Sequence, residues 1–171
     1  MSDPHEANRV TPVDRDAAAE LWETYAQAHP QAVRACPDYT VERFGDSDAL
    51  ADELLDLVLT GPKRATAALV ADFAAQGDPL PRVGSHWIAC DGSGRPRVVL
   101  RSVELRLATF EDVDEAFASD EGEGDRTLET WRDGHRRYWV RTCAARGDTW
   151  SESDEIVLER FRVVWPPDLA D

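Results

Sequence analysis

Lysine is almost absent from this chain of 171 residues, in which eighteen of the nineteen basic residues are arginines and Lys63 is the only lysine. A lysine loses its proton when it is desolvated or placed near another cation, whereas an arginine effectively does not. Keeping lysine at one position of an arginine-rich chain therefore indicates a chemical need for that side chain. The alternative is compositional drift towards arginine, which would leave Lys63 as an ordinary surface residue.

Cysteine is also scarce, because the three cysteines at 36, 90 and 143 are far apart and form no Cys-x-x-Cys pair. This spacing excludes a zinc-finger pattern and favours reduced thiols. No apolar run approaches the roughly 18 residues of a membrane span. The polar segment 1–15 lacks the apolar core of a signal peptide. We therefore expect a cytoplasmic protein without a membrane partner.

Common catalytic and cofactor-binding motifs are missing as well. The sequence contains no P-loop and no dinucleotide-binding fingerprint. Gly92-Ser93-Gly94 lacks the G-x-S-x-G pattern of a nucleophile elbow. The four histidines show no paired spacing typical of a metal site. The sequence therefore predicts no tightly bound cofactor and no dedicated metal ligands.

Positive charge is in deficit, since the formal net charge is −15. Phosphate backbones bind basic surfaces, so this charge argues against a large general affinity for nucleic acid. The charge is uneven, however: residues 111–125 contain eight acids and no base, whereas residues 126–146 contain six arginines and two acids. Any nucleic-acid contact must be local, metal-assisted, or directed to a small piece such as a nucleoside.

The length and the 42% share of hydrophobic residues indicate one folded domain. We expect a flexible N-terminal arm over residues 1–14 and a single domain over residues 15–171. Apolar spacing predicts helices at 14–29, 47–60, 111–118 and 127–141. Ser47 is suited to cap the second helix and Gly61 to end it.

Strands are predicted at 86–90, 97–107 and 155–165, with residues 31–46 as a connection. A Gly-rich turn joins the first two strands as a hairpin. The segment 63–73 fits two structures. A short helix would place Lys63 and Thr66 on one face, whereas an extended chain would direct them to opposite sides. Helices come first and strands follow, which predicts an α+β fold with a mostly antiparallel barrel or sheet.

The first candidate site is the Gly61-Pro62-Lys63-Arg64-Ala65-Thr66 segment. A rigid helix is expected to end just before it and to position it. A neutral Lys63 would act as general base towards the Thr66 hydroxyl or a water. A cationic Lys63 or Arg64 would stabilise negative charge on a substrate.

The second candidate site is the run Glu121-Gly122-Glu123-Gly124-Asp125, in which the glycines allow three carboxylates to gather. Trp131 and His135 follow at a spacing of four residues, on one face of a helix. Simpler interpretations compete: Asp125 caps the next helix, the two glutamates are solvated, and Trp131 packs in the core.

Arginines at helical spacing follow the second candidate site, and Arg132 and Arg136 are the first two of them. They predict a basic surface that either holds phosphates or balances the acids upstream.

Many short motifs occur in the order found in the ASCH domain family, a branch of the PUA-like superfamily. The chain resembles this family from about residue 44 to residue 165. The motifs are Phe44-Gly45-Asp46-Ser47, Ala51-Asp52-Glu53-Leu54, Gly61-x-Lys63-x-x-Thr66, Leu80-Pro81-x-Val83-Gly84, Asp91-Gly92-x-Gly94-x-Pro96, the acidic Glu121–Asp125 run, Trp131, His135 and Glu159-Arg160-Phe161.

The resemblance implies a small PUA-like β-barrel of mostly antiparallel strands surrounded by helices, here with an N-terminal helical extension. It also implies association with RNA and a cleft beside the Gly-x-Lys-x-x-Thr segment. Some relatives cleave single-stranded RNA, and shorter relatives hydrolyse the amide of N4-acetylcytidine with a Lys, a Thr and a Glu. Lys63, Thr66 and Glu121 match these three catalytic residues.

The longer form of this chain favours the nuclease-active relatives, so a ribonuclease is the first expectation. A nucleoside amidohydrolase and a non-catalytic module that binds RNA or a nucleotide are the alternatives. The acidic run would recruit a divalent metal, Mn²⁺ or Mg²⁺, for RNA cleavage. The residues expected to bind the substrate are Arg64, Glu123, Asp125, Trp131, Arg132, His135 and Arg136.

Overall fold

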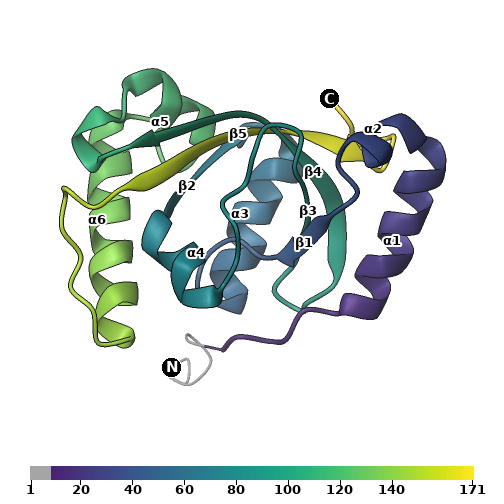
Figure 1. Cartoon of the computed structure of the whole chain (residues 1–171). Coiled ribbons are helices and arrows are strands. Elements are labelled where there is room, and N and C mark those ends of the chain that lie inside the picture. The colour runs from purple at the N-terminus through teal and green to yellow at the C-terminus, as the bar shows by residue number, and fades with distance from the viewer. Residues whose placement is uncertain (1–8) are drawn as a thin grey trace. The chain divides into compact units, whose positions relative to one another are not determined.

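The computed structural model describes residues 9–171, in two compact units that are treated separately here. Of the described residues, unit 1 comprises 9–61, Arg82–Val103 and Phe161–Asp171, and unit 2 comprises Pro62–Pro81 and Glu104–Arg160. Two long strands, β4 (Pro96–Ala108) and β5 (Ile156–Trp165), each contribute residues to both units (Figure 1).

Unit 1 combines three helices with the strands of the predicted hairpin. Its own elements are α1 (Arg15–Ala28), α2 (Pro30–Ala35), β1 (Tyr39–Glu42), α3 (Asp48–Thr60) and β3 (His86–Cys90). Strand β3 pairs with β4 in antiparallel orientation and with β1 in parallel orientation.

Unit 2 places helices around a pair of antiparallel strands. Its own elements are β2 (Ala65–Leu69), α4 (Val70–Gln76), the short 3-10 helix η1 (Phe110–Asp112), α5 (Glu115–Glu121) and α6 (Leu128–Ala145). Strand β2 pairs with β5, with Ala65 opposite Arg160 and Leu69 opposite Ile156. The strands are hydrogen-bonded in the order β1-β3-β4-β5-β2.

The predicted α+β class and the antiparallel hairpin β3–β4 are confirmed. The Ser47 side chain caps α3 by accepting a hydrogen bond from the Leu50 amide, and Gly61 ends α3 in the left-handed conformation. The segment 63–73 contains a strand followed by a helix.

The prediction of a plain connection over residues 31–46 is wrong, because this range contains α2 and β1. Strand β1 is only four residues long and alternates between half-buried and exposed positions. Its hydrogen bonds come from β3, more than forty residues away, and a short window of sequence carries no signal for such a pairing.

Residues 1–8 of the arm predicted for residues 1–14 lie outside the described residues. The part that follows is hydrogen-bonded within unit 1. The Thr11 amide and hydroxyl both donate to the Asp48 carboxylate, at 2.7 and 2.6 Å. The Asp48 amide donates in turn to the Arg9 carbonyl, and the Asp14 amide to the Gly94 carbonyl.

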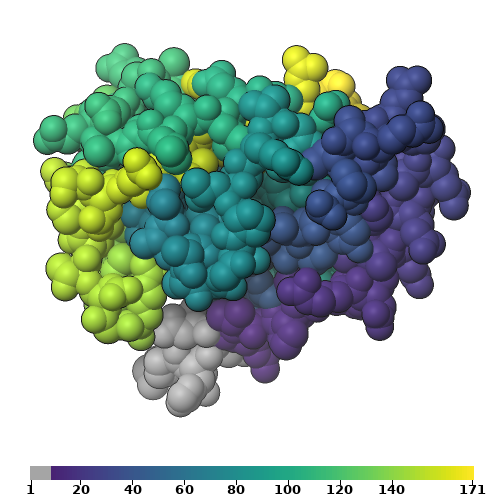
Figure 2. Space-filling view, viewed as in Figure 1, coloured from purple at the N-terminus to yellow at the C-terminus, as the bar shows by residue number. Residues whose placement is uncertain are grey.

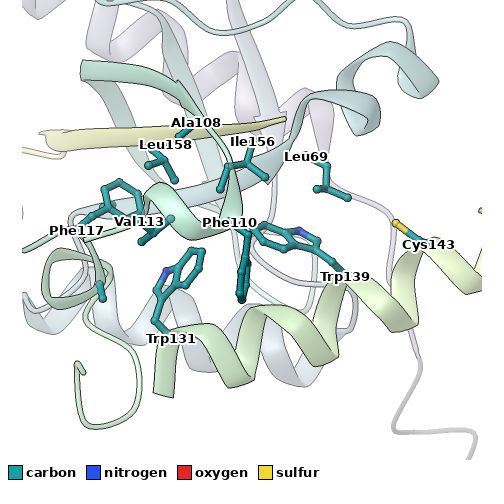
Figure 3. Close-up of a cluster of buried hydrophobic side chains, with 12 residues drawn as sticks. Leu69, Ala108, Phe110, Val113, Phe117, Trp131, Trp139, Cys143, Ile156 and Leu158 are labelled. Carbon is teal, nitrogen blue, oxygen red and sulfur yellow. The ribbon is translucent and has the colours of Figure 1, made fainter. Parts of the chain in front are cut away.

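Unit 2 has its own aromatic core. Trp131 and Trp139 project from α6 towards Phe110, and aliphatic side chains of β2 and β5 complete the cluster (Figure 3).

The Glu111–Asp125 stretch of unit 2 contributes to the outer surface shown in green in Figure 2. Among the described helices, none is long and apolar enough to cross a membrane.

The core of unit 1 holds a buried histidine. His86 and Tyr25 are 2% and 1% exposed, and the Tyr25 hydroxyl lies 2.9 Å from Nε2 of His86. Burial and, secondarily, the positive charge of Arg101 lower the pKa of His86 to about 4. His86 is therefore neutral in the folded protein at neutral pH.

This histidine gives a prediction for acid stability. The folded-state pKa of His86 lies below its ordinary value of 6.5, so its contribution to stability is present above pH 6.5 and is lost as the pH falls towards 4. We expect His86→Gln to reduce this loss, as measured by urea unfolding between pH 4 and pH 8. The exposed His29, replaced in the same way, is the control. An unchanged pH dependence in His86→Gln would contradict the prediction.

Candidate active site

Lys63 is placed by backbone contacts within unit 2. It lies just before β2, where the Arg64 amide donates a 2.7 Å hydrogen bond to the Asp120 carbonyl near the end of α5. This bond satisfies a carbonyl that the helix itself leaves unpaired. Lys63 is consequently held beside Glu121, the last residue of α5.

Gly122, which follows Glu121, permits this close approach. It adopts a left-handed conformation with φ +71° and ends α5. A Cβ atom here would lie 2.5 Å from the carbonyl carbon of Pro62 and 2.7 Å from the Lys63 amide nitrogen. Only glycine fits both the backbone angle and the space.

The Lys63 side chain is buried, with 1% of its surface exposed. Its Nζ donates to Oε1 of Glu123 at 2.7 Å and to the Glu121 carbonyl at 3.4 Å. The Glu123 side chain is itself 34% exposed. Lys63 is therefore not the surface residue that compositional drift would leave.

Glu121 is equally buried, and its two carboxylate oxygens differ in their surroundings. Oε2 accepts a 2.6 Å hydrogen bond from the Trp131 indole and lies 3.1 Å from Nε2 of His135. Oε1 is buried and has no hydrogen-bond partner within residues 9–171. We refer to the five residues Lys63, Glu121, Glu123, Trp131 and His135 as the Lys63 cluster.

The electrostatics of the Lys63 cluster favour charged side chains. Burial by itself would raise the pKa of Glu121, but the charges of His135 and Lys63 and the hydrogen bonds from His135 and Trp131 hold it below its ordinary value. Burial by itself would lower the pKa of His135, but the Glu121 carboxylate raises it overall. The cluster thus alternates in sign along His135, Glu121, Lys63 and Glu123.

Thr66 lies on the extended strand β2, directly opposite Glu159 of β5. Its neighbours Ala65 and Ala67 pack in the core cluster of unit 2, so strand alternation directs Thr66 to the other face of the sheet. Its hydroxyl forms no hydrogen bond with the Lys63 cluster. Glu159 is only 8% exposed, and its burial beside Thr66 was not predicted from the sequence.

The remaining predicted residues have partners of their own. Asp125 accepts hydrogen bonds from the amide and hydroxyl of Thr127, the residue that caps α6. Arg64 donates to the Lys63 carbonyl, and Arg132 to the Glu111 carbonyl.

Arg136 pairs with Glu152 at 2.6 Å. The structure therefore gathers five of the ten predicted residues in the Lys63 cluster, and their functional roles stay predictions.

The Lys63 cluster does not offer a dedicated set of ligands for a divalent metal. In the described part of the chain, no group of three or more His, Cys, Asp or Glu side chains is arranged to hold a metal ion. Two carboxylates of the Lys63 cluster are instead engaged with Lys63, Trp131 and His135. These residues do not fit a metal centre built by the protein alone.

Comparison with known proteins identifies the family. The ASCH domain family matches residues 40–165. A crystal structure of an ASCH domain from Lactobacillus crispatus JV V101 superposes with a TM-score of 0.80 at 27% identity, covering 90% of this chain and 97% of that one. A crystal structure of a protein from Enterococcus faecalis V583 gives 0.76 at 26% identity, covering 88% and 90%. No curated protein matches the chain significantly. The chain therefore belongs to the ASCH domain family, whose PUA-like fold is often linked to RNA binding.

Proposed function

We propose that this protein is a hydrolase of RNA-derived substrates and that the Lys63 cluster is its reaction centre. One observation carries the proposal: the only lysine of the chain is buried between two glutamates. Burying a charged group in a protein costs on the order of several kcal/mol unless nearby partners compensate for the lost hydration. Buried ionisable groups with shifted pKa values, such as the neighbouring Glu121 and His135, concentrate at functional sites.

The Lys63–Glu123 contact supplies a route for proton transfer. At 2.7 Å, the ammonium proton can pass from Nζ to Oε1 of Glu123, which leaves a free amine without changing the net charge of the pair. The free amine is a general base. Because Glu123 is 34% exposed, a substrate reaches Lys63 by displacing this side chain.

The ion pairs of the surface arginines favour an uncharged substrate. Arg136 is paired with Glu152, and Arg160 is bound to both Glu104 and Asp120. These contacts support the interpretation that the arginines of unit 2 balance nearby acids. A nucleoside carrying an acylated amino group, of the N4-acetylcytidine type, needs no basic surface and is our first candidate.

For such an amide, a water molecule attacks the acyl carbon while Lys63 takes a proton from that water. The carbon–nitrogen bond then breaks, and the amine leaves with the proton that Lys63 returns. Glu121 keeps Lys63 in position through its carbonyl and its negative charge.

Cleavage of single-stranded RNA is the second candidate, and a surface feature of α6 favours it. The Arg141 guanidinium lies over the ring of Tyr138, with 5.3 Å between the guanidinium carbon and the ring centroid. Arginine and aromatic side chains together form surfaces on which unpaired bases stack. In this reaction a carboxylate of the Lys63 cluster would accept the 2′-hydroxyl proton, and Lys63 would stabilise the phosphate oxygens.

A paired assay tests the proposal. The purified protein is given N4-acetylcytidine in one reaction and single-stranded RNA, with and without Mg²⁺ or Mn²⁺, in another. We expect release of cytidine, and we expect Lys63→Arg to reduce the rate by about 100-fold or more, the typical effect of a lost general base. Glu129→Gln, at an exposed position of α6, is the control and should retain full activity.

The other outcomes are equally informative. RNA cleavage that disappears in Lys63→Arg would make the protein a ribonuclease. Inactivity of a folded wild-type protein on both substrates would contradict the proposal and favour a binding module. Circular dichroism of each variant checks that lost activity does not reflect lost folding.

A further inference from the structure

Both ring nitrogens of His135 face groups that only accept hydrogen bonds. Nδ1 lies 2.9 Å from the Trp131 carbonyl oxygen, and Nε2 lies 3.1 Å from Oε2 of Glu121. A carbonyl and a carboxylate carry no proton to donate. Two favourable hydrogen bonds therefore require a proton on each nitrogen, which makes the ring an imidazolium cation.

The His135 ring is held in this orientation by aromatic packing. It stacks on Trp131, with ring centroids 4.0 Å apart and an interplanar angle of 14°. Trp139 packs against it at 5.1 Å and 63°. All three residues are on α6, at intervals of four, so one helix face fixes the ring.

The charges around His135 support the cation. Glu121 of α5 contacts it directly, and the negative charge of Glu123 from the following loop also acts on it. The positive charge of Lys63 also acts on Glu121, and Lys63 contacts Glu123. Neutralising His135 would remove a positive charge that directly faces the buried Glu121 carboxylate.

We propose that His135 is a positioning residue that keeps Glu121 ionised and oriented, rather than a residue that binds the substrate. Trp131 and His135 together occupy Oε2 of Glu121, so Oε1 is the oxygen left to accept a proton or a hydrogen bond. The importance of this role for catalysis rests on the proposed hydrolase function. The protonation state of His135 does not depend on that function.

Nitrogen-15 NMR of the histidine side chains in the wild-type protein tests this inference without any substrate. At pH 7.5 we expect both His135 nitrogens to carry protons. His86, which packs against Tyr25 in unit 1, is the internal control and should be a neutral ring with one proton. Assignment uses His135→Gln and His86→Gln. A neutral His135 ring at pH 7.5 would overturn the inference.

Kinetics then separate positioning from substrate binding. If the assay detects hydrolysis, we expect His135→Gln to lower kcat by about 10-fold or more with little change in KM, because Glu121 loses a partner that acts in the reaction step. A rise in KM at constant kcat would overturn the positioning role. If the wild-type protein is inactive, only the proposed function fails, and the NMR result still decides the protonation of His135.

Discussion

Replacement of Lys63 by methionine is expected to destabilise the protein by about 3–5 kcal/mol, the cost of removing one partner from a buried ion pair. Methionine has a similar length and fills the same space, so little of this loss comes from a cavity. The loss arises because the buried Glu121 loses the positive charge of Lys63 that helps to hold its pKa low, and Glu123 loses its ion-pair partner. Urea unfolding at pH 7 measures it.

Two comparisons make the Lys63→Met result specific. Arg137→Met removes a cation from an exposed position of α6 and should change stability by less than about 0.5 kcal/mol. Adding Glu123→Gln to Lys63→Met should recover part of the loss, because one uncompensated anion is removed. A Lys63→Met protein as stable as the wild type would show that the buried charges are not coupled.

The Gly122→Ala variant should lose about 2–5 kcal/mol, the sum of backbone strain at positive φ and steric overlap in a packed site. The added methyl group would lie 2.5 Å from the Pro62 carbonyl carbon. Relief of this overlap must move the segment that carries Lys63. Activity should therefore fall together with the midpoint of thermal unfolding.

Gly77→Ala is the matched control for Gly122→Ala. Gly77 also ends a helix of unit 2, with φ +74°, but no atom lies within 4 Å of a Cβ placed there. Alanine at position 77 would have the backbone strain of positive φ without the steric overlap, so this variant should lose about 1–2 kcal/mol of stability. Equal losses in the two variants would contradict the role assigned to the contact with Pro62.

The sequence predicts those parts of the fold that local signals determine. Ser47 and Gly61 delimit α3 through capping and a left-handed residue, both of which act within one turn of the chain. The hairpin β3–β4 follows from a Gly-rich turn between apolar runs. Asp125, for which capping of the next helix is the simpler interpretation, is not the N-cap of α6: Thr127 holds that position, and Asp125 accepts a hydrogen bond from its hydroxyl.

Features that depend on contacts distant in sequence are not predictable from local patterns. Strand β2 is extended because it pairs with β5, about ninety residues later, while its alanines are also good helix formers. The burial of Lys63 depends on a hydrogen bond from Arg64 to Asp120. The resemblance to a known family named Lys63 and Glu121 together, but the pairing of Lys63 with Glu123 and of Glu121 with Trp131 and His135 required the structure.

Because the only lysine of the chain is buried, chemical modification of Lys63 reports how accessible the Lys63 cluster is. Amine-directed reagents modify exposed lysine side chains, and here no second lysine competes with Lys63. The rate at which Lys63 is modified therefore measures how often its amine becomes accessible to the solvent. A ligand that occupies the Lys63 cluster would protect this lysine amine, so mass spectrometry of the peptide that contains Lys63 can screen for substrates before any reaction is known.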